Sequence, residues 1–517
     1  MFGAPQHPSQ ADSQAKPPAD DTLSADLSLT LKKFQGQLGS SPDVIIRHMA
    51  FGPRNDRLAL LYVEGIAETR PVLEFLMQKA SDPEFHSTVV HSDLWNLLCD
   101  KLLAVGEIKK SASLQTLCHS ALCGDTVLLV HGYAAGLVLG TKQWKDRGVE
   151  EPSAQTVVRG PRDGFTETLR TNTALVRRRI KSPDLRMEAR TIGRVTQTDV
   201  ALLYIQGIVN ESVLGEVRNR LERIDIDAIL ESGYIEELIQ DSTWSPFPTI
   251  YNTERPDALA AGILEGRVAI LIDGTPFALL VPALFSQFFQ SSEDYYQRAD
   301  FATLLRILRY LCFFVTLLAP SLYVAVTTFH QELLPPELLI RLVAAREGVP
   351  FPAFVEAMMM ELTFEILREA GIRMPRTVGQ AVSIVGTLVI GQAAVEAGLV
   401  SPSMVIVVSI TAISNFVIPS FNMGISLRIL RFFIMFIAAS FGLFGIVVCL
   451  IGVVLHLCSL RSFGVPYLSP FAPFILEEQK DSIFRLPQWA LFRRPKLIAQ
   501  NNRQRGQSPV PRPEKRV

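Results

Sequence analysis

The chain has 517 residues, of which 48% are hydrophobic and 20% are charged, and its formal net charge is −1. This average is too apolar for an ordinary soluble protein and too charged for a pure transporter, so it predicts a soluble part joined to a membrane part. The near-zero net charge and six cysteines without a CxxC pair give no reason to expect a nucleic-acid partner, a disulfide framework, a metal site or a cofactor.

The chain begins with a polar segment. Its first twenty residues, MFGAPQHPSQADSQAKPPAD, contain no apolar run of the kind found in a signal peptide. Residues 1–40 are predicted to form a disordered, Pro-rich tail.

The next part of the chain contains an internal repeat with an offset of 142 residues. The matching strings are ALLYVEGI (59–66) with ALLYIQGI (201–208), and VLLVHGYAAGLV (127–138) with AILIDGTPFALL (269–280). Two matches in the same phase predict a duplicated α/β head, with one subdomain at residues 41–158 and a similar one at 193–290. Each copy opens with a strand and closes with a hairpin of two apolar strands around a glycine.

The hairpin of the second copy lies just before the membrane part. Asp273-Gly274 is a turn signal, and His131-Gly132 occupies the equivalent place in the first copy, which argues against a catalytic Asp273. The apolar run 277–289 is expected to be an interfacial helix that leads into the first span. The candidates for coupling the head to the membrane are therefore Asp273, Gly274, Pro276 and Arg298.

A basic helical connector is expected between the copies, at residues 159–192. Asp163 and Thr166 can cap its helix, which should end before Pro183. The basic run of this helix is either a solvated or salt-bridged surface or a docking site for anionic lipid or a partner. It comprises Arg177, Arg178, Arg179 and Lys181.

Four apolar runs in residues 291–465 approach the roughly 20 residues that a spanning helix needs. They predict an all-α, polytopic membrane domain with spans near 310–329, 381–400, 402–424 and 432–460. Arginines before the first span and a basic tail at 466–517 after the last indicate that the head and the tail are both cytoplasmic. Arg428 and Arg431, which this topology puts on the outer side, argue against it.

The segment 351–370 is predicted to be an amphipathic helix. At 100° per residue, Glu361, Glu365 and Glu369 lie on one stripe. The stripe is either the solvated face of an interfacial helix or the lining of a water-filled vestibule.

Further polar residues interrupt the second and third spans. Gln392 and Glu396 lie four residues apart, and Glu396 either reaches interfacial water or forms a charged ring between protomers. Asn415 and Pro419 mark a gate or a simple bend. Four spans cannot enclose a pathway within one chain, so conduction requires a homo-oligomer. The small residues of the second span allow helices of neighbouring protomers to pack closely. A ring of Glu361, Glu365 or Glu396 in such an oligomer would attract cations.

Several long strings resemble one family. They are GPRDGF, ILIDGTPFALLVP with SSEDYYQR, EILREAGIRMP, GQAVSIVGTLVIGQAAVEAGLVSP, FVIPSF and PYLSPFAPF, and they occur in the expected order between about residues 40 and 500. In these strings the chain resembles the A subunits of the bacterial spore germinant receptor, the GerA family.

The resemblance implies a multi-pass protein of the inner spore membrane. It implies a nutrient-responsive receptor with a transporter-like B subunit and a lipoprotein C subunit, in which the A subunit oligomerises into a channel for monovalent cations.

Two alternatives remain open at this stage. One is a paralogous channel that amplifies germination without sensing nutrients, and the other is a signalling scaffold whose soluble head binds a small molecule. The sequence contains no P-loop, GxSxG or HExxH motif, so no enzyme is expected.

Overall fold

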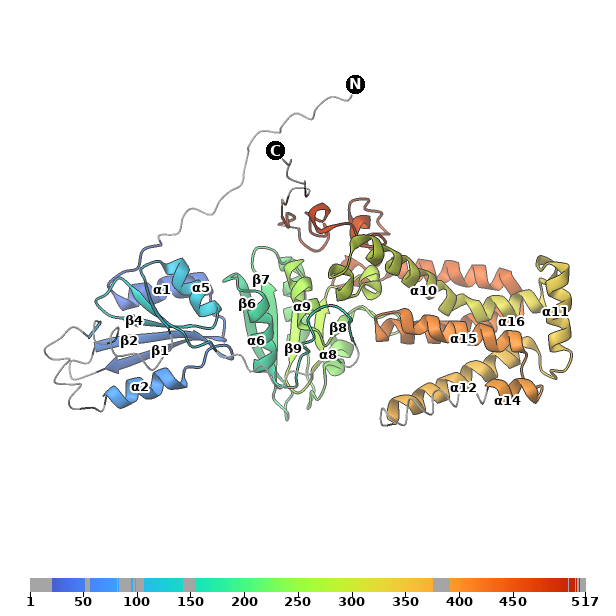
Figure 1. The fold of residues 1–517 in the computed structure, drawn as a ribbon, viewed down its shortest axis with the longest axis horizontal. Helices are drawn as coiled ribbons and strands as arrows, with labels where there is room; N and C mark the ends of the chain where they lie inside the picture. The colour runs from blue at the N-terminus through green and yellow to red at the C-terminus, as the bar shows by residue number, and fades with distance from the viewer. Residues whose placement is uncertain are drawn as a thin grey trace, which may run out of the picture. The chain divides into compact units, whose positions relative to one another are not determined.

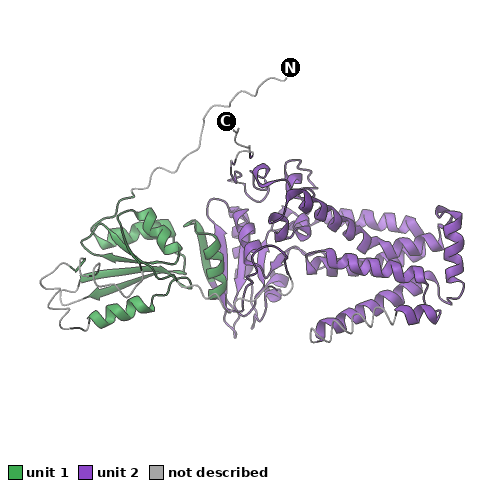
Figure 2. Ribbon diagram, viewed as in Figure 1, with its two compact units in different colours: residues 1–148, 170–189 green, residues 149–169, 190–517 purple. Residues whose placement is uncertain are grey.

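The computed structural model describes residues 21–51, 56–80, 82, 94–95, 98, 107–142, 152, 155–374, 391–500, 502–506, 508 and 511. The chain forms two compact units, residues 1–148 with 170–189, and residues 149–169 with 190–517 (Figure 2). Two five-stranded sheets follow one another along the chain, and a helical part comes after them (Figure 1). A soluble α/β region followed by membrane-type helices is confirmed.

The first sheet has the strand order β1-β2-β4-β5-β3, with every neighbouring pair antiparallel. Its elements are α1 (Leu27–Leu38), β1 (Val44–Phe51), β2 (Asp56–Val63), α2 (Arg70–Ala80), β3 (Ile108–Ser111), α5 (Leu114–Leu122), β4 (Thr126–Val130) and β5 (Gly136–Leu139). Side chains of β2 alternate between its two faces. Ala59 and Leu61 pack with α1 and α5, while Leu58 and Leu60 pack with α2.

Helix α1 corrects the expected length of the N-terminal tail. Asp26 caps it by accepting a hydrogen bond from the amide of Ser28 at 3.0 Å. Its apolar stripe, including Leu31 and Phe34, is buried in the first core. The tail therefore cannot extend to residue 40, because burial of this stripe holds the helix in the fold.

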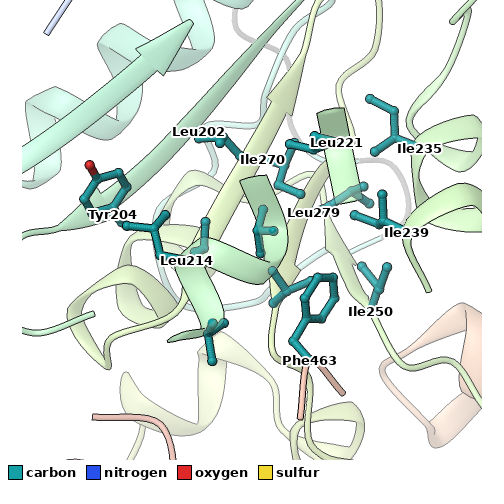
Figure 3. Close-up of a cluster of buried hydrophobic side chains, with 14 of the residues drawn as sticks. Leu202, Tyr204, Leu214, Leu221, Ile235, Ile239, Ile250, Ile270, Leu279 and Phe463 are labelled. Atoms are coloured by element: carbon teal, nitrogen blue, oxygen red, sulfur yellow. The ribbon is translucent and has the colours of Figure 1, made fainter. Parts of the chain in front are cut away.

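The second sheet has the order β6-β7-β9-β10-β8, which matches the first position by position. Its elements are β6 (Leu185–Ile192), β7 (Thr198–Ile205), α7 (Glu211–Glu222), α8 (Ser232–Ile239), β8 (Tyr251–Thr253), α9 (Pro256–Leu264), β9 (Val268–Ile272) and β10 (Ala278–Val281). Figure 3 shows its core, in which Leu202, Ile270 and Leu279 of the sheet meet Leu214 and Leu221 of α7. Duplication of the sequence itself stays a prediction.

Two segments around the second sheet differ from expectation. Strand β6 occupies the end of the expected connector, so the connector's helix is α6 (Leu169–Arg179) alone. The interfacial helix expected at 277–289 is wrong, because β10 pairs on both sides, with β9 and β8. After it comes a short 3₁₀ helix, η1 (Phe285–Phe289), whose phenylalanines pack against Phe313 and Tyr467 instead of lipid.

The helical part contains two helices long and apolar enough to cross a membrane, α10 (Ala299–Thr328) and α16 (Phe421–Ser459), among the residues described. Other elements here are η2 (Ser292–Tyr295), η3 (Gln331–Leu333), α11 (Pro336–Arg346), α12 (Ala353–Arg373), α14 (Gly391–Glu396) and the shorter apolar helix α15 (Pro402–Val417). The first half of the run 381–400, residues 381–390, lies outside the described residues. Pro419 separates α15 from α16, so the run 402–424 is not one helix.

Helix α16 is two helices joined at Gly442, whose φ of 60° and ψ of −145° are non-helical. The two ends of α16 contact the same loop. The hydroxyl of Ser426 donates to the carbonyl oxygen of Pro246, and the hydroxyl of Ser245 lies 2.9 Å from Nε2 of His456. At about 1.5 Å per residue, Ser426 and His456 would lie roughly 45 Å apart on one straight helix, so α16 folds back on itself as a hairpin.

The expected C-terminal tail is largely folded into the second unit. The strands β11 (Arg461–Ser462) and β12 (Val465–Pro466) lead into it, and it contains η5 (Glu478–Asp481) and η6 (Gln488–Ala490). Phe463 points into the core of the second sheet (Figure 3), and Ile498 belongs to the same cluster. A segment with these apolar side chains gains stability by burying them, although its net charge is basic.

Candidate functional site

The acidic stripe of α12 meets basic side chains of α16. An oxygen of Glu361 lies 2.7 Å from Nη2 of Arg431, and each side chain is only 1% exposed. Glu365 lies 2.6 Å from Nη1 of Arg428 and 3.5 Å from Arg431. The four-residue spacing of the acids and the three-residue spacing of the arginines put both pairs on facing helix surfaces. We call these four residues the bundle cluster.

The interpretation of the whole stripe as a solvated face is therefore wrong for Glu361 and Glu365. It holds for Glu369, which is exposed and pairs with Arg373 on its own helix at 2.7 Å. Burying a charge is costly unless it has a partner, and here each buried carboxylate has a guanidinium beside it.

The bundle cluster has hydrogen-bonding capacity that it does not use. Both carboxylate oxygens of Glu361 and two guanidinium nitrogens of Arg431 form no hydrogen bond with the part of the protein that the structure describes. The Glu361 carboxylate and the Arg431 guanidinium are close enough for an ion pair, but the N–H groups do not point at the oxygens as a hydrogen bond requires. Asn415, also buried, has an unused side-chain oxygen and lies against Gly424, one turn before Arg428. Polar groups in this state can accept water or an ion.

A third carboxylate of α12, Glu356, is a buried site residue that the sequence pattern did not predict. It is fully buried, accepts a hydrogen bond from the amide of Ser401 at 2.6 Å and another from the Ser401 hydroxyl, and lies 3.7 Å from Nε of Arg346. Ser401 is the N-cap of α15. Glu356 thus ties the start of α12 to the start of α15. It lies five residues before Glu361, about 140° away around the helix, so the periodicity of the acidic stripe could not have identified it.

The remaining predicted pore residues do not join this cluster. Gln392 and Glu396 lie on α14, where the Gln392 amide donates to Glu396 at 2.9 Å, and both are exposed. Pro419 lies in the break between α15 and α16, and the N-cap Ser420 follows it. It marks a helix boundary, not a kink within a helix.

A second buried cluster lies at the base of α10. Asp294 of η2 accepts hydrogen bonds from Nε of Arg306 at 3.0 Å and from Nη1 of Arg309 at 2.7 Å. Nη1 of Arg306 also donates to Asp481 of η5, to its carbonyl oxygen at 2.7 Å and to its carboxylate at 3.0 Å. We call these four residues the base cluster. It links the segment after the second sheet, the first apolar helix and the C-terminal segment.

Local structure holds the base cluster in place. Ser291 and Asp294 form a capping box at the start of η2, and the hydroxyl of Tyr295 donates to the Asp481 carboxylate at 3.0 Å. Burial raises the pKa of Asp481, and the Arg306 guanidinium opposes that shift. The sequence identified Arg306 and Arg309 only as topology markers, because nothing local shows that they turn back toward SSEDYYQR.

The predicted coupling residues have other roles. The carboxylate of Asp273 accepts a hydrogen bond from the amide of Leu169, the first residue of α6, at 2.8 Å. The hydroxyl of Thr166 accepts one from the amide of Thr168, just before that helix. Gly274, at φ 89°, forms the hairpin turn that Pro276 follows. Arg298 precedes α10 and pairs with Asp300 at 2.8 Å in an exposed position.

The basic connector is only partly a surface. Arg177 is buried and binds Asp43 with two hydrogen bonds, of 2.6 and 3.2 Å, within the first unit. Arg178 and Lys181 are exposed, and Arg179 is partly buried. Among the described residues, no group of three or more His, Cys, Asp or Glu side chains is placed to hold a metal ion.

Comparison of the sequence with known proteins identifies the family of this chain. Residues 32–497 match the family described as Bacillus/Clostridium GerA spore germination protein. The chain belongs to the GerA family. This GerA chain is 50% identical to spore germination protein KA of Bacillus subtilis, over 95% of its own length and 90% of that protein. It is 40% identical to spore germination protein B1 of the same species, over 92% of its own length and 97% of that protein.

A solved structure covers part of this GerA chain. It is the N-terminal domain of the A subunit of the Bacillus megaterium spore germinant receptor GerK3, with 41% identity and a TM-score of 0.42. The alignment covers 51% of this chain and 97% of the solved one. The resemblance of the sequence to the GerA family is confirmed by the family match over residues 32–497 and by the identity to the spore germination proteins KA and B1.

Proposed function

We propose that this GerA protein is the A subunit of a nutrient-responsive germinant receptor and that several copies form a cation channel in the spore membrane. The observation that supports the proposal most directly is the bundle cluster. Carboxylates that could attract cations are held inside the membrane part, each beside an arginine of the same protomer. Separation of α12 from α16 would expose Glu361 and Glu365 and remove their neutralising partners.

We assign a closed state to the arrangement in which the bundle cluster is paired. Unpaired carboxylates in a membrane favour cation entry, whereas the paired arginines cancel their charge. Opening must compensate for the loss of one buried ion pair, Glu361 with Arg431, and one partly buried pair, Glu365 with Arg428. Incoming water, which can hydrogen-bond to the unused polar groups, would partly offset this cost. Gln392 and Glu396, exposed on α14, remain candidates for a surface shared between protomers.

The hairpin of α16 supports a topology with the head and the C-terminal segment on one side. Ser426 and His456, one near each end of α16, contact the same loop of the soluble region. Each arm of the hairpin is then one crossing, so Arg428 lies close to the head. This placement removes the conflict between Arg428, Arg431 and the positive-inside rule, with the head cytoplasmic.

The base cluster is the proposed route from the head to the channel. Movement of the second sheet would shift η2, and Asp294 would carry that shift to α10 through Arg306 and Arg309. The nutrient itself would be recognised with the transporter-like B subunit, together with the lipoprotein C subunit that the family resemblance implies.

The channel proposal can be tested in spores and with purified protein. Arg431→Gln should leave Glu361 unneutralised and give cation release without nutrient, whereas Glu361→Gln should slow nutrient-triggered release. Glu369→Gln is the matched control, because Glu369 lies on the same helix in an exposed pair. A monomer in mild detergent, or wild-type cation release in both cluster variants, would contradict the proposal.

A further inference from the structure

A pocket of about 380 Å³ lies where the C-terminal segment covers the end of the second sheet. Its walls come from Glu265 and Arg267 before β9, from η1, and from residues 470–505. We call it the C-terminal pocket. Its volume is within the range of small-molecule sites.

Basic side chains outnumber acidic ones in the walls. The seven basic residues are Arg267, Lys480, Arg493, Arg494, Lys496, Arg503 and Arg505, and the four acidic ones are Glu265, Glu477, Glu478 and Asp481. The acids are already engaged. Their partners are Arg505 for Glu265 and Arg493 for Glu477, each at 2.7 Å, the Lys496 amide for Glu478 at 2.6 Å, and Arg306 for Asp481 at 3.0 Å.

Positive charge therefore remains for a ligand. Within the described part of the chain, Lys480 and Arg503 form no ion pair with a carboxylate within 4.0 Å. Arg267 is 4% exposed, and its Nη2 lies 3.5 Å from the Glu265 carboxylate, which also pairs with Arg505. Its Nη1 donates to the carbonyl oxygen of Pro282 at 2.8 Å and to the side chain of Gln287, and its Nε has no hydrogen-bond partner among the described residues. Burial lowers the pKa of Arg267. An anion in the pocket would offset the cost of burying this guanidinium.

The other surfaces of the pocket are apolar. Leu284, Ile475 and Leu491 line it, and Phe492 lies beneath Nζ of Lys480 at 5.9 Å from its ring centre. Arginine binds phosphate well because its planar fork of N–H donors matches the phosphate oxygens. We propose that the C-terminal pocket binds a small molecule that carries a phosphate group and an apolar body.

The pocket shares a wall with the base cluster. Asp481 lines the pocket and also holds Arg306 of α10. A ligand that moves η5 would change the position of Asp481. Binding in the C-terminal pocket would thus reach the first apolar helix, independently of the nutrient-recognising subunit.

Phenyl phosphate is a suitable probe, because it combines a dianion with a flat apolar ring. We expect saturable binding to the full-length protein in phosphatidylcholine nanodiscs, measured by calorimetry. The double variant Lys480→Gln/Arg503→Gln should weaken binding at least about tenfold. Arg461→Gln, an exposed arginine in β11, is the matched control and should bind like the wild type.

The phosphate could come from a soluble molecule or from a lipid headgroup, and the same variants separate the two. Binding of phenyl phosphate in neutral nanodiscs would assign a soluble ligand. A rise in thermal midpoint in phosphatidylglycerol nanodiscs that is lost in the double variant would assign a lipid. The proposal is overturned if neither effect is seen, if phenol binds as well as phenyl phosphate, or if Arg461→Gln weakens binding equally.

Discussion

Replacement of Asp294 with Asn tests the base cluster most directly. Asp294 is buried, and one of its oxygens accepts hydrogen bonds from both Arg306 and Arg309. Asparagine has nearly the same shape but no charge, so the two guanidinium groups lose their shared counter-ion. Removal of one partner from a buried ion pair costs about 3–5 kcal/mol.

The expected cost lies at the lower end of this range. Arg306 keeps Asp481, whereas Arg309 keeps, among the described residues, the carbonyl oxygen of Phe289 at 3.0 Å. We therefore expect about 3 kcal/mol, which corresponds to roughly a hundredfold change in the local opening equilibrium. Hydrogen exchange of η1 and η2 in the full-length protein, followed by mass spectrometry, would measure this change.

Asp300→Asn provides the matched control. Asp300 pairs with Arg298 at 2.8 Å, but both side chains are mostly exposed. Solvent screens such pairs, so exchange of η1 and η2 should stay at the wild-type rate. Equal exchange in Asp294→Asn and Asp300→Asn would refute the claim that the base cluster holds η2 against α10.

Three further predictions follow from other sites. In a double-mutant cycle, the effects of Glu361→Gln and Arg431→Gln on the free energy of unfolding in detergent should differ from additivity by about 1–3 kcal/mol. Additive effects would exclude a direct ion pair between the two side chains. Burial raises the pKa of Glu236 to about 7. Between about pH 4.5 and 7 the folded state then binds more protons than the unfolded state, so the thermal stability of the wild type should fall as pH rises through this range. Glu236→Gln should remove this pH dependence, and an unchanged pH dependence would contradict the raised pKa of Glu236. Gly442→Ala should destabilise the α16 hairpin by about 1–3 kcal/mol, because the added Cβ would lie 2.7 Å from Cε1 of His330. Gly452→Ala is the control: an added Cβ there meets no atom within 4 Å, so the unfolding midpoint should not change.

The contrast between expected and observed sites shows which structural features a local sequence pattern can predict. The continuous apolar run at the start of ALLYIQGI predicts a buried strand, and β7 has that structure, with every residue from Val200 to Ile205 buried, because such a run is a property of one segment. The run 277–289 is equally apolar, but its partners are strands β9 and β8 and the ring of Tyr467, which no local pattern specifies. Hydrophobicity indicates that a segment is buried without indicating what buries it.

The sequence by itself determined the division into a soluble α/β region and membrane-type helices, and it determined the family, because both depend on residues read in order. Only the tertiary structure decided which charges meet. Glu361 pairs with Arg431 across two helices, and Asp294 pairs with arginines of α10 that the sequence identified as topology markers. Periodicity puts a charge on a helix face, but the energy of a buried charge depends on the group opposite that face. The packing of the chain therefore decided which acids are surface residues and which are candidates for gating.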